Sequence, residues 1–126
     1  MMNAYQQYKM NSVMLASPEK LLIMMYDGII RFIEAAKESL RKKDIKGAHK
    51  NILRAQDLVT ELNMSLDMEH EVSMGLSRIY DFLHSRLVDA NIKKDIAILE
   101  EIEPIVKEMK ETWLEAISNK KESLVK

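Results

Sequence analysis

The chain has 126 residues, of which 47% are hydrophobic and 31% are charged, enough for one domain with a buried core and a solvated surface. Three glycines and two prolines are too few for the turns of an all-β fold, and the absence of cysteine excludes a disulfide scaffold, a thiol nucleophile and a zinc finger. The net charge of −1 argues against a broad nucleic-acid or anionic-membrane footprint. No apolar run approaches the roughly 18 residues of a membrane span. We therefore expect a cytoplasmic protein that neither binds nucleic acid nor inserts into a membrane.

Residues 1–16 are polar with scattered apolar side chains and lack a long helical period. They include Tyr5, Tyr8 and the run from Val13 to Leu15, which a free tail would not need. Because chain termini are disordered unless they are tied down, we expect this N-terminal arm to dock on the rest of the protein.

The first helix has a clear start. Ser17 is a typical N-cap, Pro18 suits the first helical position, and Glu19 is favourable near the positive end of the helix. Apolar residues then recur at spacings of three and four as far as about Lys42, which predicts one buried face. That face comprises Leu22, Met25, Ile29, Phe32, Ile33, Ala36 and Leu40.

Three further helices follow. Asp44 and Asp95 are placed as N-caps of the second and fourth, and the third is expected over about 69–91. Pro104, inside the fourth, is expected to kink it. The predicted inward residues are Ile45, Ala48, Ile52, Ala55, Val59, Leu62 and Leu66; Val72, Leu76, Ile79, Tyr80, Leu83, Leu87 and Ala90; and Ile96, Leu99, Ile102, Val106, Met109, Trp113 and Ile117.

Short loops between long helices favour antiparallel neighbours. The sequence therefore predicts an all-α fold, an antiparallel up-down four-helix bundle over residues 17–118. The N-terminal arm, 1–16, docks on this bundle, and residues 119–126 form a frayed C-terminal tail.

Two Asp-x-x-His pairs, Asp67–His70 and Asp81–His84, invite comparison with a di-iron bundle. That site needs such a pair on each of two helices and two more inward glutamates, whereas both pairs here belong to the third helix or its start. Haem ligation by one methionine and one histidine is a weak alternative, because ten methionines and three histidines make a chance pairing easy. No phosphate-binding loop, nucleophile elbow or serine–histidine–acid set is present. We expect no catalytic residue, no metal, no cofactor and no enzymatic activity.

The helices also carry apolar residues that point away from the predicted core. Together with the two arm tyrosines, these outward side chains are the candidate partner contacts, because surplus apolar surface and abundant methionine suit a protein-binding module. The candidate residues are Tyr5, Tyr8, Ile23, Ile30, Leu53, Met64, Met74 and Val88.

The stretch from Ala16 to Ile30, ASPEKLLIMMYDGII, closely resembles the signature of the flagellin-specific export chaperone family, FliS. The resemblance extends over about residues 5–117, including Glu61-Leu62 and Ser65-Leu66-Asp67 on the second helix and Tyr80-Asp81-Phe82 on the third. Gly75 and Pro104 depart from the usual family pattern.

The resemblance implies a cytoplasmic chaperone whose bundle is wrapped by the C-terminal segment of flagellin, which it keeps export-competent and prevents from polymerising early. It also implies that the arm covers part of the flagellin site in the free chaperone; direct contact between the arm and flagellin stays open. Other flagellar regulators are further possible partners. The alternative reading is a regulatory helical-bundle adaptor that binds another amphipathic helical partner.

Overall fold

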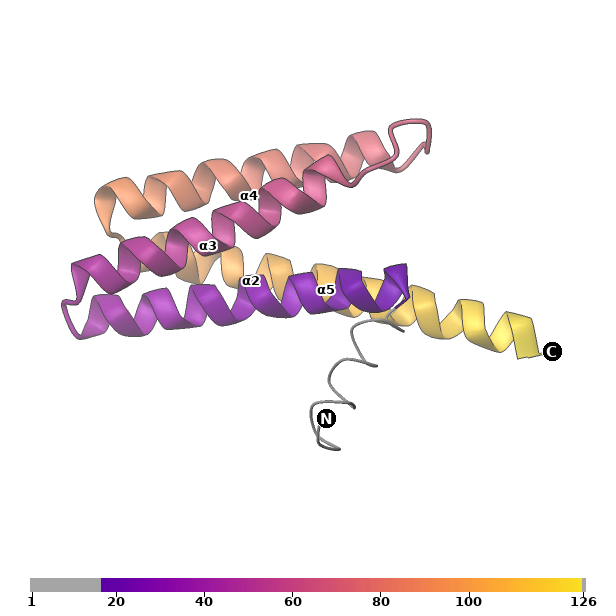
Figure 1. Ribbon diagram of the computed structural model, residues 1–126, viewed down its shortest axis with the longest axis horizontal. Helices are drawn as coiled ribbons and strands as arrows, with labels where there is room; N and C mark the ends of the chain where they lie inside the picture. The colour runs from indigo at the N-terminus through magenta and orange to yellow at the C-terminus, as the bar shows by residue number, and fades with distance from the viewer. Residues whose placement is uncertain (1–16, 126) are drawn as a thin grey trace, which may run out of the picture.

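The computed structural model describes residues 17–125, with side chains as far as Lys120, so the predicted arm with Tyr5 and Tyr8 lies outside the described residues. Within this range the chain forms four helices: α2 (Pro18–Arg41), α3 (Ile45–Met64), α4 (Ser73–Lys93) and α5 (Ile96–Val125). They run up and down in turn, and each packs against its two neighbours in the order α2, α3, α4, α5 and back to α2 (Figure 1). The predicted all-α four-helix bundle is confirmed.

The predicted N-caps explain where the helices begin. Ser17 and Asp44 each accept a hydrogen bond from the backbone amide three residues later, at 3.1 and 3.0 Å, and Asp95 accepts one from the amide two residues later at 2.9 Å. These side chains satisfy amides that the first turn of a helix leaves without partners.

The third helix begins at Ser73, four residues later than predicted. The intervening loop has its own hydrogen bonds: the Asp67 carboxylate accepts from the Glu69 amide at 3.0 Å, and the Asp67 carbonyl accepts from the Ser73 hydroxyl at 2.6 Å. Local side-chain bonds of this kind compete with helix formation. Val72, predicted to be inward, therefore precedes the helix and is 66% exposed.

The buried core matches most of the predicted inward residues, with corrections at two more positions. Ile45 is exposed because it starts α3 at the end of the bundle, and Ile79 is exposed because it faces the α4–α5 boundary. Tyr26, which the periodicity left out, is fully buried. The buried apolar residues are Tyr26, Ile29, Ile33, Ala36, Ala48, Ile52, Ala55, Val59, Leu62, Tyr80, Leu83, Leu87, Ala90, Ile98, Leu99, Ile102 and Val106.

Helix α5 continues without interruption through Pro104 and past residue 118, where the bundle was expected to end, as far as Val125. Its last turns extend beyond the other helices (Figure 1). Next to the proline, Glu103 is buried and its carboxylate accepts a 3.0 Å bond from the ammonium group of Lys37, which joins α5 to α2.

Candidate functional site

A wide apolar groove lies between α4 and α5, the two adjacent helices that pack most sparsely against each other. Its volume is about 820 Å³. It is lined by Val72, Leu76, Arg78, Ile79, Phe82, Ile105, Glu108, Met109, Thr112, Trp113 and Ala116. Phe82 is 44% exposed, so a large aromatic side chain stands uncovered on the wall of the groove. An exposed apolar groove of this kind is typical of a surface that binds another chain.

The two ends of the α4–α5 boundary differ, and this difference explains why the groove lies toward the start of α4. Toward the end of α4, the guanidinium of Arg86 bonds to Glu101 on α5 at 2.6 Å and to Asp89 at 3.1 Å. The hydrogen bonds to these two carboxylates raise the pKa of Arg86. Toward the start of α4, the side chains facing α5 are apolar, and α3 and α4 diverge from α2 and α5 (Figure 1).

A buried hydrogen-bond chain supports the floor of this groove. The hydroxyls of Tyr26 on α2 and Tyr80 on α4 lie 2.6 Å apart, and the Trp113 indole on α5 donates to the Tyr26 hydroxyl at 3.2 Å. Burial raises the pKa of both tyrosines above the usual value. Trp113 is thus a groove residue whose orientation depends on the core.

A second groove of about 650 Å³ lies on the other side of α4, between α4 and α3. It includes two of the predicted contacts, Met64 and Val88, which the structure brings together. Its remaining lining is more polar than that of the α4–α5 groove: His84 lines it, and Asn63 donates a 2.9 Å bond to Asp81 across the boundary. The two grooves place apolar contact surface on both sides of α4.

The other predicted contacts are dispersed. Ile23 and Ile30 are half-buried and line separate hollows between α2 and α5, where Ile30 packs against the core. Leu53 is 39% exposed on α3 and lines neither groove. Met74 is exposed at the start of α4, where its sulfur accepts a 3.8 Å hydrogen bond from the guanidinium of Arg78.

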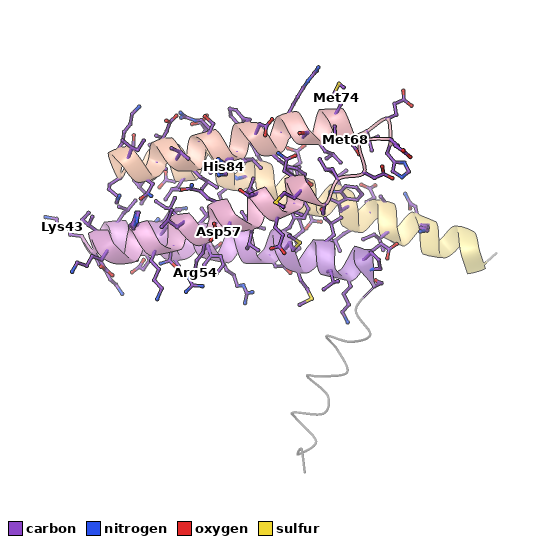
Figure 2. All side chains as sticks on the ribbon, turned by 45° about the horizontal axis from the view of Figure 1, so that its top comes forward. Lys43, Arg54, Asp57, Met68, Met74 and His84 are labelled. Atoms are coloured by element: carbon purple, nitrogen blue, oxygen red, sulfur yellow. The ribbon has the colours of Figure 1, made fainter. Side chains whose placement is uncertain are left out.

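Three exposed methionines, Met64, Met68 and Met74, surround the α3–α4 loop. Met68 and Met74 lie at the same end of the bundle, opposite the end that carries Lys43 (Figure 2). We call these three residues the methionine corner. Methionine is flexible and polarizable, so this corner can adapt to apolar side chains of different shapes.

The Asp-x-x-His pairs form no shared site. The side chains of Asp67 and His70 are exposed and lie 3.6 Å apart in the loop before α4, and Asp81 instead bonds to Asn63. Within residues 17–120, no three histidine or carboxylate side chains come together as a metal site. No helix in the part of the chain that the structure describes is long and apolar enough to cross a membrane.

Sequence reasoning assigned five of the eleven residues that line the α4–α5 groove to the core, and left out Phe82. The signal was present in α4 itself, whose apolar residues cover more of the helix surface than one buried face requires. Leu83 and Leu87 fill the core, while Leu76, Ile79 and Phe82 lie toward the groove.

Comparison with known proteins identifies the family. A family model described as Flagellar protein FliS matches residues 1–120. The flagellar secretion chaperone FliS of Bacillus subtilis (strain 168) is 35% identical over 119 residues, covering 94% of this chain and 90% of the relative. The FliS of Campylobacter jejuni is 33% identical over 118 residues, covering 92% of each. A crystal structure of a flagellar chaperone from bacteria shares the fold, with a TM-score of 0.77 at 19% identity over 92% of this chain and 96% of that one. The chain belongs to the FliS family of flagellar secretion chaperones.

Proposed function

We propose that this protein binds the C-terminal segment of flagellin in the cytoplasm, prevents its premature polymerisation and keeps it competent for export. The observation that carries the proposal is the exposed apolar groove that the described residues form between α4 and α5, with Phe82 and Trp113 in its lining. Binding alone performs this function, so the proposal requires neither a catalytic residue nor a cofactor.

The groove suits an amphipathic helix or an extended apolar segment. Along α5 the groove runs from Ile105 to Ala116, eleven residues or about 16 Å, which corresponds to about three turns of a client helix. Apolar client side chains at helical spacing would contact Ile79 and Phe82 on one wall and Met109 and Trp113 on the other. A segment that is disordered when free would order only on binding, and the entropy cost of ordering would fall at that step.

A longer client segment would continue onto the α3–α4 groove, where Met64 and Val88 lie. The methionine corner between the two grooves offers a path around the start of α4. This arrangement agrees with the wrapped mode of binding that the family resemblance implies. Ile23, Ile30, Leu53 and Met74 remain proposed contacts of the same client.

Phe82→Asp tests the site. We expect affinity for a flagellin C-terminal peptide, measured by calorimetric titration, to fall at least tenfold, because a desolvated aromatic anchor contributes about 2 kcal/mol or more. Ile92→Asp is the matched control, since Ile92 is on the same helix, is 76% exposed and lies outside both grooves. Equal losses in the two variants, or no loss in Phe82→Asp, would contradict the proposed site.

We also propose that the arm, with Tyr5 and Tyr8, covers part of this surface until the client displaces it. An arm that is docked about 90% of the time weakens apparent binding about tenfold. Deleting residues 1–14 should then tighten binding of the same peptide. Weaker binding after the deletion would instead show that the arm contacts flagellin directly.

The alternative function is a regulatory adaptor for another amphipathic helix, since an apolar groove does not by itself specify its client. A scrambled peptide of the same composition distinguishes the two. Binding of the flagellin peptide but not of the scrambled one supports the chaperone; equal binding of both supports a less selective adaptor.

A further inference from the structure

One end of the bundle concentrates positive charge that the near-neutral total conceals. The α2–α3 and α4–α5 turns lie at this end, where a 2.9 Å hydrogen bond between the side chains of His49 and Asn91 joins α3 to α4. Residues 41–50 hold five basic and one acidic side chain, and residues 91–95 hold two basic and one acidic. Glu38, at the end of α2, pairs with Arg41 and Lys42. With Glu38 counted, this end carries a net charge of +4, in a chain whose total is −1.

The two acidic side chains of these turns are already engaged. Asp44 and Asp95 accept backbone hydrogen bonds as N-caps, so neither is placed to pair with a lysine. The ammonium group of Lys94 is held by Asn91. By contrast, Lys43, Lys46, Lys50 and Lys93 are exposed and form no ion pair with any residue whose side chain the structure describes.

Helix stability explains only part of this charge. Lys93 is favourable at the negative end of α4, but Lys46 and Lys50 lie in the first two turns of α3, where the helix dipole disfavours cations. Lys43 has a φ of 61°, a conformation that glycine or asparagine adopts more easily.

Two isoleucines project from the same end. Ile45, at the start of α3, is 52% exposed, and Ile92, in the last turn of α4, is 76% exposed. Each is flanked in sequence by exposed lysine, so apolar side chains and positive charges alternate across one end of the molecule.

We propose that this basic end, formed by Lys43, Ile45, Lys46, Ile92 and Lys93, docks peripherally on an anionic phospholipid membrane. Lysine ammonium groups would contact the lipid headgroups, and the isoleucines would enter the boundary between headgroups and acyl chains. A membrane suits this surface better than an acidic protein does, because the charged surface is the end of a bundle rather than a groove, and exposed isoleucines stand beside its lysines.

The opposite end of the bundle supports this orientation. Residues 61–73, around the α3–α4 loop, hold four acidic side chains and no lysine or arginine. Repulsion from an anionic surface would turn that end away, and the methionine corner and the wide part of the α4–α5 groove would turn away with it (Figure 2). A docked chaperone would therefore keep its client groove accessible.

The test is co-sedimentation of the full chain, without flagellin, with vesicles of phosphatidylcholine alone or with about 30% phosphatidylglycerol. We expect at least tenfold stronger partition into the anionic vesicles at about 100 mM NaCl, and most of it lost at about 500 mM, where charge is screened within a few ångströms. No preference for anionic vesicles would overturn the proposal. Because no flagellin is present, the outcome is independent of the proposed client.

Charge reversal locates the surface. Lys43→Glu/Lys46→Glu/Lys93→Glu should abolish the preference, whereas Lys20→Glu/Arg31→Glu/Arg54→Glu, with the same change in net charge on the sides of the bundle, should retain most of it. Ile45→Ser/Ile92→Ser should weaken binding severalfold without changing its salt dependence. Equal losses in the two charge-reversal variants, both folded by circular dichroism, would show a net-charge effect and overturn the assignment to this end.

Discussion

Replacing Tyr26 by phenylalanine removes one oxygen atom, and the structure indicates that this oxygen serves two neighbours. It accepts from the Trp113 indole at 3.2 Å and shares a hydrogen bond of 2.6 Å with the Tyr80 hydroxyl. The substitution therefore breaks both bonds and leaves the buried Tyr80 hydroxyl without a partner. Tyr80→Phe breaks only one of the bonds, because the indole still donates to Tyr26.

The expected difference in destabilisation between the two variants follows from the number of hydrogen bonds that each one breaks. A hydrogen bond contributes about 1 kcal/mol net, and a buried group left unsatisfied adds about 1–3 kcal/mol. We expect Tyr26→Phe to destabilise the protein by about 3 kcal/mol and Tyr80→Phe by about 1 kcal/mol. For a chain of this size these values correspond to losses of roughly 10 and 4 °C in Tm.

Urea unfolding followed by circular dichroism measures both changes, provided that the slope with denaturant stays constant. The double variant should be more stable than Tyr26→Phe alone by about 1 kcal/mol or more, since the second change removes the buried hydroxyl that the first had left unpaired. The reasoning is refuted if Tyr80→Phe is as destabilising as Tyr26→Phe, or if the two effects simply add.

Three further outcomes are expected. Gly75→Ala should stabilise the protein by about 0.5 kcal/mol in urea unfolding, because an added Cβ meets nothing within 4 Å, whereas Gly28→Ala should not, because its Cβ would lie 2.8 Å from a leucine side chain of α3. Stabilisation by both substitutions would contradict this packing. Lys37→Met should destabilise the protein by about 3 kcal/mol, because it leaves the Glu103 carboxylate buried and unpaired, and adding Glu103→Gln should restore part of that loss. A neutral effect of Lys37→Met would show that the pair is not effectively buried. Folding raises the pKa values of the two buried tyrosines, so the stability they contribute is fully present below their unfolded pKa of about 10 and is lost as the pH rises above it. Tm should therefore fall less steeply at alkaline pH in Tyr26→Phe/Tyr80→Phe than in the parent chain.

The helices could be predicted because their signals are local. Ser17, Asp44 and Asp95 mark three starts, and the spacing of apolar residues identifies most of the core. The start of α4 could not be placed, because it depends on which of two competing bonding patterns Asp67 and Ser73 adopt.

The α4–α5 groove could be predicted less well, for a different reason. Periodicity shows that Ile79 and Trp113 share a face with core residues, but not how closely the helix opposite approaches them. That separation depends on the packing of whole helices, here joined at one end through Arg86 and Glu101 and open at the other. The link from Trp113 to Tyr26 spans 87 positions in the sequence, so no local pattern could indicate it.

The position of Trp113 makes the protein its own spectroscopic reporter. It is the single tryptophan of the chain, it lies half-buried in the α4–α5 groove, and its indole nitrogen is held by the core. A client segment that covers the groove would exclude water from the ring while leaving that hydrogen bond intact. Client binding should therefore shift the intrinsic emission to shorter wavelength and protect it from a soluble quencher, so occupancy of this groove can be followed without a label.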